Sequence, residues 1–258
     1  FVETAFRKGN KGNELWVSQM TNGQVHAFDL DSLELLNSID CGGSWPKVIC
    51  ASPDQKRIYV SNWLTHDISV IDGEEKRLLS RIKVSGIPRG MAIDSRTDLL
   101  YVCLFDTGNI DIIDCKLKRY IRTLELGPGA KRHIVIDEDS DRAYVSDMYT
   151  GMVTVISLKE NREIVSRRVG SNINTIKLSP DGRYLFVSVR GKNNPESYLY
   201  KGPEFGSVAV LKTDDLSLFT RIRGRNQTTG LAVSPDSRLL AFSDFLDDNL
   251  EIYSIDLP

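Results

Sequence analysis

Positively charged and aromatic side chains recur along this chain beside short apolar runs, in a combination suited to binding anions and sugar-like or flat ligands. The basic members are Lys47, Arg89, Arg132, His133 and Arg190. The aromatic members are Trp45, Trp63 and Phe105, and the other polar members are Asp147, Asn174, Gln227 and Asp244. An arginine bonds two oxygens of a carboxylate or phosphate at once, and a ring offers rigid contact area. The set predicts a binding site for a small anionic molecule, a glycan, or a peptide or protein partner.

The same residues permit an enzymatic alternative. His133 could act as a general base, with Glu3 or Asp147 as its partner or as a ligand of a divalent metal ion. No Ser-His-Asp spacing, glycine-rich phosphate loop or metal-ligand cluster accompanies it. We therefore predict binding without a catalytic residue, cofactor or metal, and keep an enzyme built on His133 as the alternative.

An internal repeat positions these residues. Six similar runs have their third residue at positions 17, 60, 102, 145, 187 and 242, so that successive steps are 43, 42, 43, 42 and 55 residues. A period of about 40 to 50 residues is typical of β-propeller blades. Apolar residues alternate or form short β-branched runs and never follow helical spacing, which predicts an all-β chain.

Each repeat reads as four short antiparallel strands, the first apolar and the fourth polar, so we expect the first on the inside and the fourth outside. Six blades result if Val2–Phe6 is the first inner strand, and the sixth then stops after its third strand at Pro258. We predict one propeller domain over residues 1–258. Seven blades are possible if a segment precedes Phe1.

The repeats differ most at the starts of first strands and just after second strands, which in antiparallel neighbours open onto one face of the disc. The candidate residues all fall at these positions, so we predict that they share that face. The alternative is structural: Arg and Asp of adjacent blades pair with one another, and the aromatic rings pack between blades.

A long insertion at 190–206 joins the second and third strands of the fifth blade and opens onto the same face. Loops of this size in compact domains are usually functional or disordered. Its aromatic residues Tyr198, Tyr200 and Phe205 favour an ordered flap over the candidate site, with packing on the rim as the alternative.

The runs Tyr59-Val60-Ser61-Asn62 and Tyr144-Val145-Ser146-Asp147, and the following Ile68-Ser69-Val70-Ile71-Asp72, resemble the YVTN family of β-propeller repeat proteins over nearly the whole chain. Members include bacterial surface-layer and exported proteins, with lactonase-like propellers nearby. The resemblance implies an extracytoplasmic location, in the periplasm or at the cell surface, and a role as an envelope binding protein. It also keeps open a lactonase- or lyase-like enzyme and a pure envelope scaffold, because a fold does not assign chemistry.

The amino-acid composition limits the kinds of partner and bound group that we expect. The formal net charge of −2 gives no overall attraction to nucleic acid, which we therefore do not expect as a partner. No apolar run approaches the roughly 18 residues that a spanning helix needs. The four cysteines fit neither a disulfide framework nor a zinc pattern, so we predict no disulfide.

Overall fold

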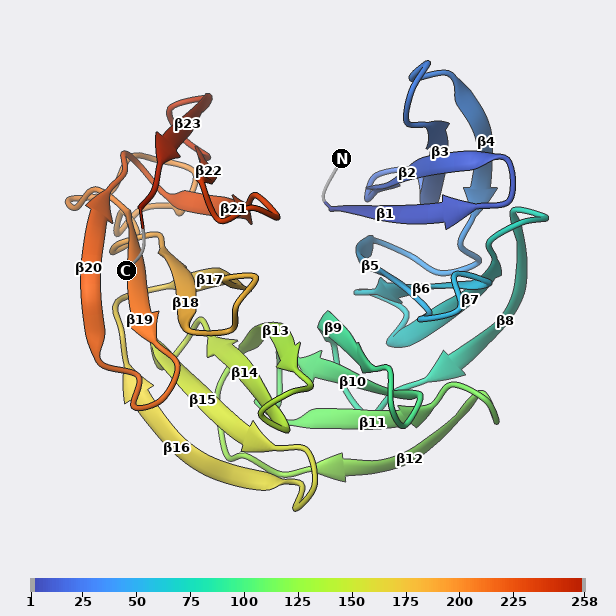
Figure 1. Cartoon of the computed structure of the whole chain (residues 1–258), viewed down its shortest axis with the longest axis horizontal. Helices are drawn as coiled ribbons and strands as arrows, with labels where there is room; N and C mark the ends of the chain where they lie inside the picture. Colours follow the sequence, from blue (N-terminus) through green and yellow to red (C-terminus); the bar gives the residue numbers. More distant parts are fainter. Residues whose placement is uncertain (1–2, 257–258) are drawn as a thin grey trace. The chain divides into compact units, whose positions relative to one another are not determined.

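The structure is a computed structural model that describes residues 3–256, so Val2, the start of the first predicted strand, lies outside the described residues. These residues form 23 strands in six antiparallel sheets and no helix (Figure 1), which confirms the all-β prediction. In each sheet, strands follow one another in chain order. We call each sheet a blade. None of the described residues belongs to a helix that could span a membrane.

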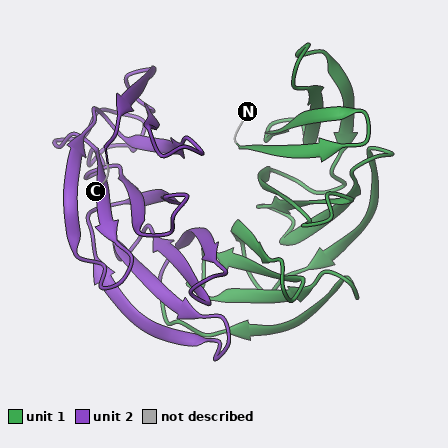
Figure 2. Cartoon of the chain, viewed as in Figure 1, with its two compact units in different colours: residues 1–128 green, residues 129–258 purple. Residues whose placement is uncertain are grey.

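The chain divides into two compact units, residues 1–128 and 129–258 (Figure 2). Unit 1 holds three blades of four strands. Blade 1 consists of β1 (Thr4–Gly9), β2 (Gly12–Gln19), β3 (Gln24–Asp29) and β4 (Leu35–Asp40). Blade 2 consists of β5 (Pro46–Ala51), β6 (Arg57–Asn62), β7 (Asp67–Asp72) and β8 (Arg77–Lys83). Blade 3 consists of β9 (Pro88–Asp94), β10 (Leu99–Leu104), β11 (Ile110–Asp114) and β12 (Arg119–Leu124).

Unit 2 holds two blades of four strands and a sixth of three, as the repeat predicted. Blade 4 consists of β13 (Lys131–Asp137), β14 (Arg142–Asp147), β15 (Met152–Ser157) and β16 (Arg162–Arg168). Blade 5 consists of β17 (Ile173–Leu178), β18 (Tyr184–Val189), β19 (Ser207–Lys212) and β20 (Leu218–Arg223). Blade 6 consists of β21 (Thr228–Val233), β22 (Leu239–Asp244) and β23 (Asn249–Ser254).

Apolar side chains on both faces of a second strand pack into two hydrophobic cores, one on each side of the blade. On β6, Ile58 and Val60 pack with Trp16 of blade 1, whereas Tyr59 between them packs with Met91 of blade 3. Successive side chains of a strand point to opposite faces. A strand that is apolar throughout is therefore buried on both faces, and neighbouring blades share a core.

The predicted exposure of the polar fourth strands is confirmed, whereas the apolar first strands are not the most buried ones. The fourth strands β16 and β20 are almost wholly exposed, as their charged sequences predicted. The most buried strands are the second and third, such as β18 and β7, while the first strands are only partly buried. A first strand has one neighbour within its own sheet, whereas the second and third have two, so the middle strands lose more solvent contact.

Serine residues near the ends of second strands join adjacent blades through backbone groups. Ser61 accepts a hydrogen bond from Val48 N–H of its own blade (3.0 Å) and donates one to the Arg89 carbonyl of the next blade (3.0 Å). Ser188 likewise accepts from Thr175 N–H (2.9 Å) and donates to the Thr229 carbonyl (2.9 Å). We call these contacts the serine links.

Candidate functional site

The serine links identify one equivalent position at the start of four of the first strands. The acceptor carbonyls belong to Lys47 (2.7 Å from Ser18 Oγ), Arg89, Asn174 (2.6 Å from Ser146 Oγ) and Thr229. The backbone environment at these positions is the same in every case. Their side chains differ from blade to blade.

At three of these four positions, the residue two places earlier in the chain has a left-handed backbone conformation. Trp45, Asn172 and Gln227 have φ values of 59°, 53° and 61°. For residues other than glycine this conformation costs about 1 to 2 kcal/mol, and a bulky residue such as tryptophan adopts it rarely. Backbone strain of this kind concentrates at binding and catalytic sites.

In unit 1 the structure brings together four of the predicted residues. Lys47 Nζ lies 5.1 Å from the centre of the Trp45 ring and 5.5 Å from that of Trp63, and it also contacts Met20 Sδ at 2.7 Å. The Trp63 and Phe105 rings are 4.8 Å apart and tilted by 51°. This cluster is a cation held between aromatic faces, with Trp45 itself 40% exposed.

Arg89 lies in the same unit and is almost completely buried, with 7% of its surface exposed. Its Nη1 has no hydrogen-bond partner among residues 3–256, and no ion pair of Arg89 occurs in that range. Burial lowers the pKa of Arg89 from its usual value, and the negative charge of Glu3 opposes this shift only in part. A buried guanidinium without a paired anion is costly.

Unit 2 contains a second buried guanidinium. Arg190 directly follows β18 and is 9% exposed; it donates to Gln227 Oε1, while its Nε lacks a hydrogen-bond partner in the described part of the chain. Burial lowers the pKa of Arg190. The Nδ2 donor of buried Asn174 is likewise unsatisfied within residues 3–256. The register of β17 and β18, which pairs Ile173 with Val189, places Asn174 and Arg190 on neighbouring strand ends.

The insertion at 190–206 leaves β18 and returns at β19 with no strand of its own. Its middle contacts the candidate site, because the Tyr198 carbonyl accepts a hydrogen bond from the Gln227 amide. Lys201 Nζ pairs with Asp247 of blade 6 at 2.6 Å. Its end packs against the outer strand, where Phe205 stacks under Arg223. The loop thus contacts both Gln227 and the outer strand, and a covering role over the site stays a prediction.

Two predicted site residues, Asp147 and Asp244, end second strands. Each forms hydrogen bonds with the loop that precedes the first strand of the same blade. Asp147 is fully buried, pairs with Lys131 Nζ at 2.8 Å and accepts from Ala130 N–H at 3.1 Å. Burial alone would raise the pKa of Asp147, but the hydrogen bond from Lys131 leads the contacts that lower it below its ordinary range. Asp244 accepts from Arg225 N–H at 3.1 Å and from the Thr228 hydroxyl. These contacts lie within one blade, so they are not the Arg–Asp pairs between adjacent blades that the structural alternative describes.

Arg132 and His133 are half-buried at the start of β13, and His133 N–H donates to Ser146 Oγ at 3.1 Å. Glu3 is half-buried in unit 1, where its backbone N–H donates to Ser18 Oγ at 3.1 Å. The structure contains no group of three His, Cys, Asp or Glu residues suited to a metal ion within the described range. All four cysteines are free thiols.

Unit 1 also contains a buried network of charged residues that the sequence did not predict. Arg7, 2% exposed, pairs with Glu14 (2.9 Å) and Glu74 and donates to the Gln55 carbonyl (2.6 Å). Lys76 also pairs with Glu14, at 2.7 Å. These residues come from blades 1 and 2, and nothing in their spacing along the chain indicates that they meet.

Comparison with known proteins agrees with the architecture. The structure of hydrazine synthase from Kuenenia stuttgartiensis matches 98% of this chain and 76% of its own with a TM-score of 0.85 at 20% identity. The fold is a six-bladed β-propeller. A candidate 6-phosphogluconolactonase from Bacteroides fragilis matches with a TM-score of 0.80 at 19% identity over 98% of this chain and 80% of its own. At such identities the likeness concerns the fold alone.

A curated relative is more similar in sequence. Antigen Lp49 of Leptospira interrogans serogroup Icterohaemorrhagiae is 40% identical over 252 residues, which is 95% of this chain and 55% of the relative. The chain thus spans about half the length of that protein. No family model matches the chain, so membership of the YVTN family stays a prediction.

Proposed function

We propose that the protein is a non-catalytic, exported β-propeller that binds an anionic ligand, or an anionic group of a partner, at the variable ends of its first and second strands. The main support is the pair of buried guanidiniums, Arg89 in unit 1 and Arg190 in unit 2. Neither has a carboxylate partner within residues 3–256. A bound anion supplies the missing charge.

Neighbouring groups suit such a ligand. Asn174 and Gln227 provide neutral hydrogen-bonding groups in unit 2, and the aromatic rings around Lys47 provide contact area in unit 1. An anion held in a buried site by an arginine gains from the low local dielectric and the planar donor geometry. A carboxylate of a peptide or an acidic sugar meets these requirements.

The proposed location rests on the similar protein called an antigen and on the motif resemblance. Immunolabelling of intact and permeabilised cells tests it. Labelling restricted to permeabilised cells, together with fractionation into the cytosol, would contradict export.

The binding proposal is tested by calorimetric titration of acetate, citrate and glucuronate into the wild-type protein and into Arg89→Met and Arg190→Met. We expect saturable binding in each unit, and each substitution should weaken binding in its own unit at least about tenfold, since a charge-assisted hydrogen bond is worth roughly 1.5 to 3 kcal/mol. Arg238→Met is the matched control, because Arg238 is an exposed residue of a Ser-Pro-Asp turn. Equal affinity in all variants would overturn the proposal.

A further inference from the structure

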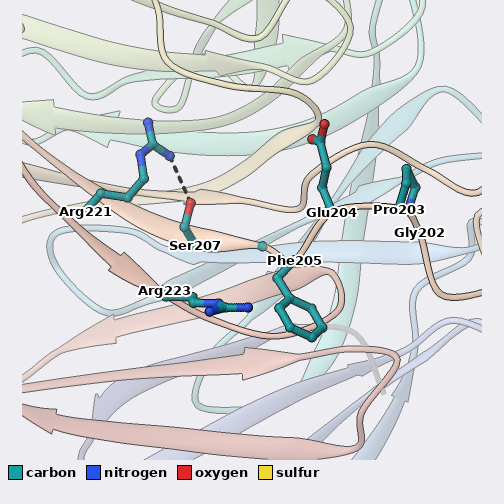
Figure 3. Close-up of a pocket in the computed structure, with 8 residues that line it drawn as sticks. Gly202, Pro203, Glu204, Phe205, Ser207, Arg221 and Arg223 are labelled. Atoms are coloured by element: carbon teal, nitrogen blue, oxygen red, sulfur yellow. Dashed lines mark hydrogen bonds between the residues drawn. The ribbon is translucent and has the colours of Figure 1, made fainter.

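A groove on the outer strand of blade 5 lies apart from the residues predicted above. It has a volume of about 750 Å³ and is lined by residues 202–206 of the insertion, Ser207 of β19, and Arg221 and Arg223 of β20 (Figure 3). We call it the β20 groove. Arg223 and Phe205 also line a second hollow of about 760 Å³, so these two side chains form the wall between them.

Arg223 is held against an aromatic ring. Its guanidinium carbon lies 4.9 Å from the centre of the Phe205 ring. Stacking on a ring fixes the guanidinium plane and leaves the N–H groups at its edge available. Within residues 3–256 no carboxylate forms an ion pair with Arg223.

Arg221 is held by two hydrogen bonds from its terminal nitrogens. Nη1 donates to Ser207 Oγ and Nη2 to the Val169 carbonyl, both at 2.9 Å. A guanidinium carries five N–H donors, so donors remain after these bonds. Burial lowers the pKa of Arg221, and the described chain supplies it with no carboxylate partner either. Its position is therefore fixed while its charge is not compensated.

Spacing brings the two arginines to one side of the sheet. Arg221 and Arg223 are two residues apart on β20, where they pair with Ala209 and Ser207 of β19. Alternate residues of a strand point to the same face, about 6.5 to 7 Å apart. Nearby acids are engaged elsewhere: Glu204 pairs with Lys192 at 2.8 Å, and Glu251 lies 3.8 Å from Arg225.

From these contacts we propose that the β20 groove is a second binding site, specific for a tetrahedral oxyanion, a phosphate or sulfate group, on a ligand whose organic part lies beside Phe205. Two fixed guanidiniums on one strand can together donate to several oxygens, which suits a tetrahedral anion better than a single carboxylate. The Phe205 ring remains 50% exposed and offers a surface to a ring or sugar attached to that anion.

The site can be located directly by NMR of arginine Nε–H groups during titration with inorganic phosphate, inorganic sulfate, phenyl phosphate and phenyl sulfate at constant ionic strength. Loss of a signal in Arg221→Gln or Arg223→Gln assigns it. We expect saturable shifts at both arginines and at least about tenfold weaker binding in either variant. Comparing the phosphate and sulfate arms tells which group is preferred.

Controls separate this site from the one proposed above. Arg238→Gln makes the same charge change outside the groove and should leave the shifts of the Arg221 and Arg223 signals unchanged. Phe205→Leu should weaken phenyl phosphate more than inorganic phosphate. Shifts confined to Arg190 or Arg89, absence of saturable binding, or unchanged affinity in both Arg221→Gln and Arg223→Gln would overturn the inference. The first of these results would still support the proposed function.

Discussion

Two buried arginines of unit 1 should respond in opposite ways to the same substitution. Arg7 is enclosed by Glu14, Glu74 and the Gln55 carbonyl, whereas Arg89 has an unsatisfied nitrogen and no ion pair within residues 3–256. Methionine keeps much of the side-chain volume and removes the charge. The comparison therefore isolates what each charge contributes to the folded protein without ligand.

The magnitudes follow from burial and pairing. Breaking a buried pair by removing one partner costs roughly 3 to 5 kcal/mol, so Arg7→Met should destabilise the protein by about that amount. Replacing a whole buried ion pair by apolar residues is often neutral or stabilising by about 1 to 4 kcal/mol, and removing the Arg89 charge leaves no paired carboxylate behind within residues 3–256. We expect Arg89→Met to raise the free energy of unfolding by about 1 to 2 kcal/mol, which is several degrees in Tm.

Urea unfolding monitored by tryptophan fluorescence is a suitable assay. The chain has three tryptophans, Trp16, Trp45 and Trp63, and all belong to unit 1 with both arginines. The buffer should contain only chloride as anion. Adding a bound anion at about 100 times its Kd should stabilise the wild type by about 2.7 kcal/mol and leave Arg89→Met unaffected. A loss of more than about 1 kcal/mol in Arg89→Met would refute the reasoning, because the guanidinium would then be structurally satisfied.

Three further outcomes are expected. Ser61→Ala leaves Val48 N–H and the Arg89 carbonyl without their partner, so it should lower the free energy of unfolding in urea by about 1 to 3 kcal/mol. Ser32→Ala, an exposed control, should change this free energy little, and equal effects of the two substitutions would contradict the link. Deleting residues 192–204 should weaken anion binding at Arg190 in calorimetry while leaving Arg89 unaffected, and unchanged affinity would exclude a covering role. The hydrogen bond from Lys201 lowers the pKa of Asp247 from 3.8 to about 2, so the contact stabilises the fold above pH 3.8 and is lost as the pH falls toward 2. The protection of insertion amides against exchange, relative to the intrinsic rate at each pH, should fall in that window, and a fall already at pH 5 would point to another group.

The sequence predicted most of the strands because one period governs them. The equivalent residues Val17, Val60, Val102, Val145, Val187 and Phe242 all fall on second strands. The Ser-Pro-Asp turns also form as expected, with Ser179 Oγ 2.6 Å from Asp181 Oδ1. These features are local, so turn chemistry and alternation suffice to recognise them.

The partners of charged side chains could not be predicted in the same way. Asp147 was chosen for its polarity, but its oxygens are taken up by Lys131 and by backbone N–H groups of its own blade. Arg7 was not singled out, although its partners Glu14 and Glu74 make it a central residue of a buried network. Whether a charged residue binds a ligand or a neighbour depends on distances between segments, which residue types alone do not determine.

The serine links have a consequence for how this protein can change over evolutionary time. The atom that Ser61 recognises in the following blade is the carbonyl oxygen of Arg89, which any amino acid would provide. Lysine, asparagine and threonine occupy the equivalent position at Lys47, Asn174 and Thr229. These side chains can therefore be exchanged one at a time, while the serine links between blades keep their hydrogen bonds.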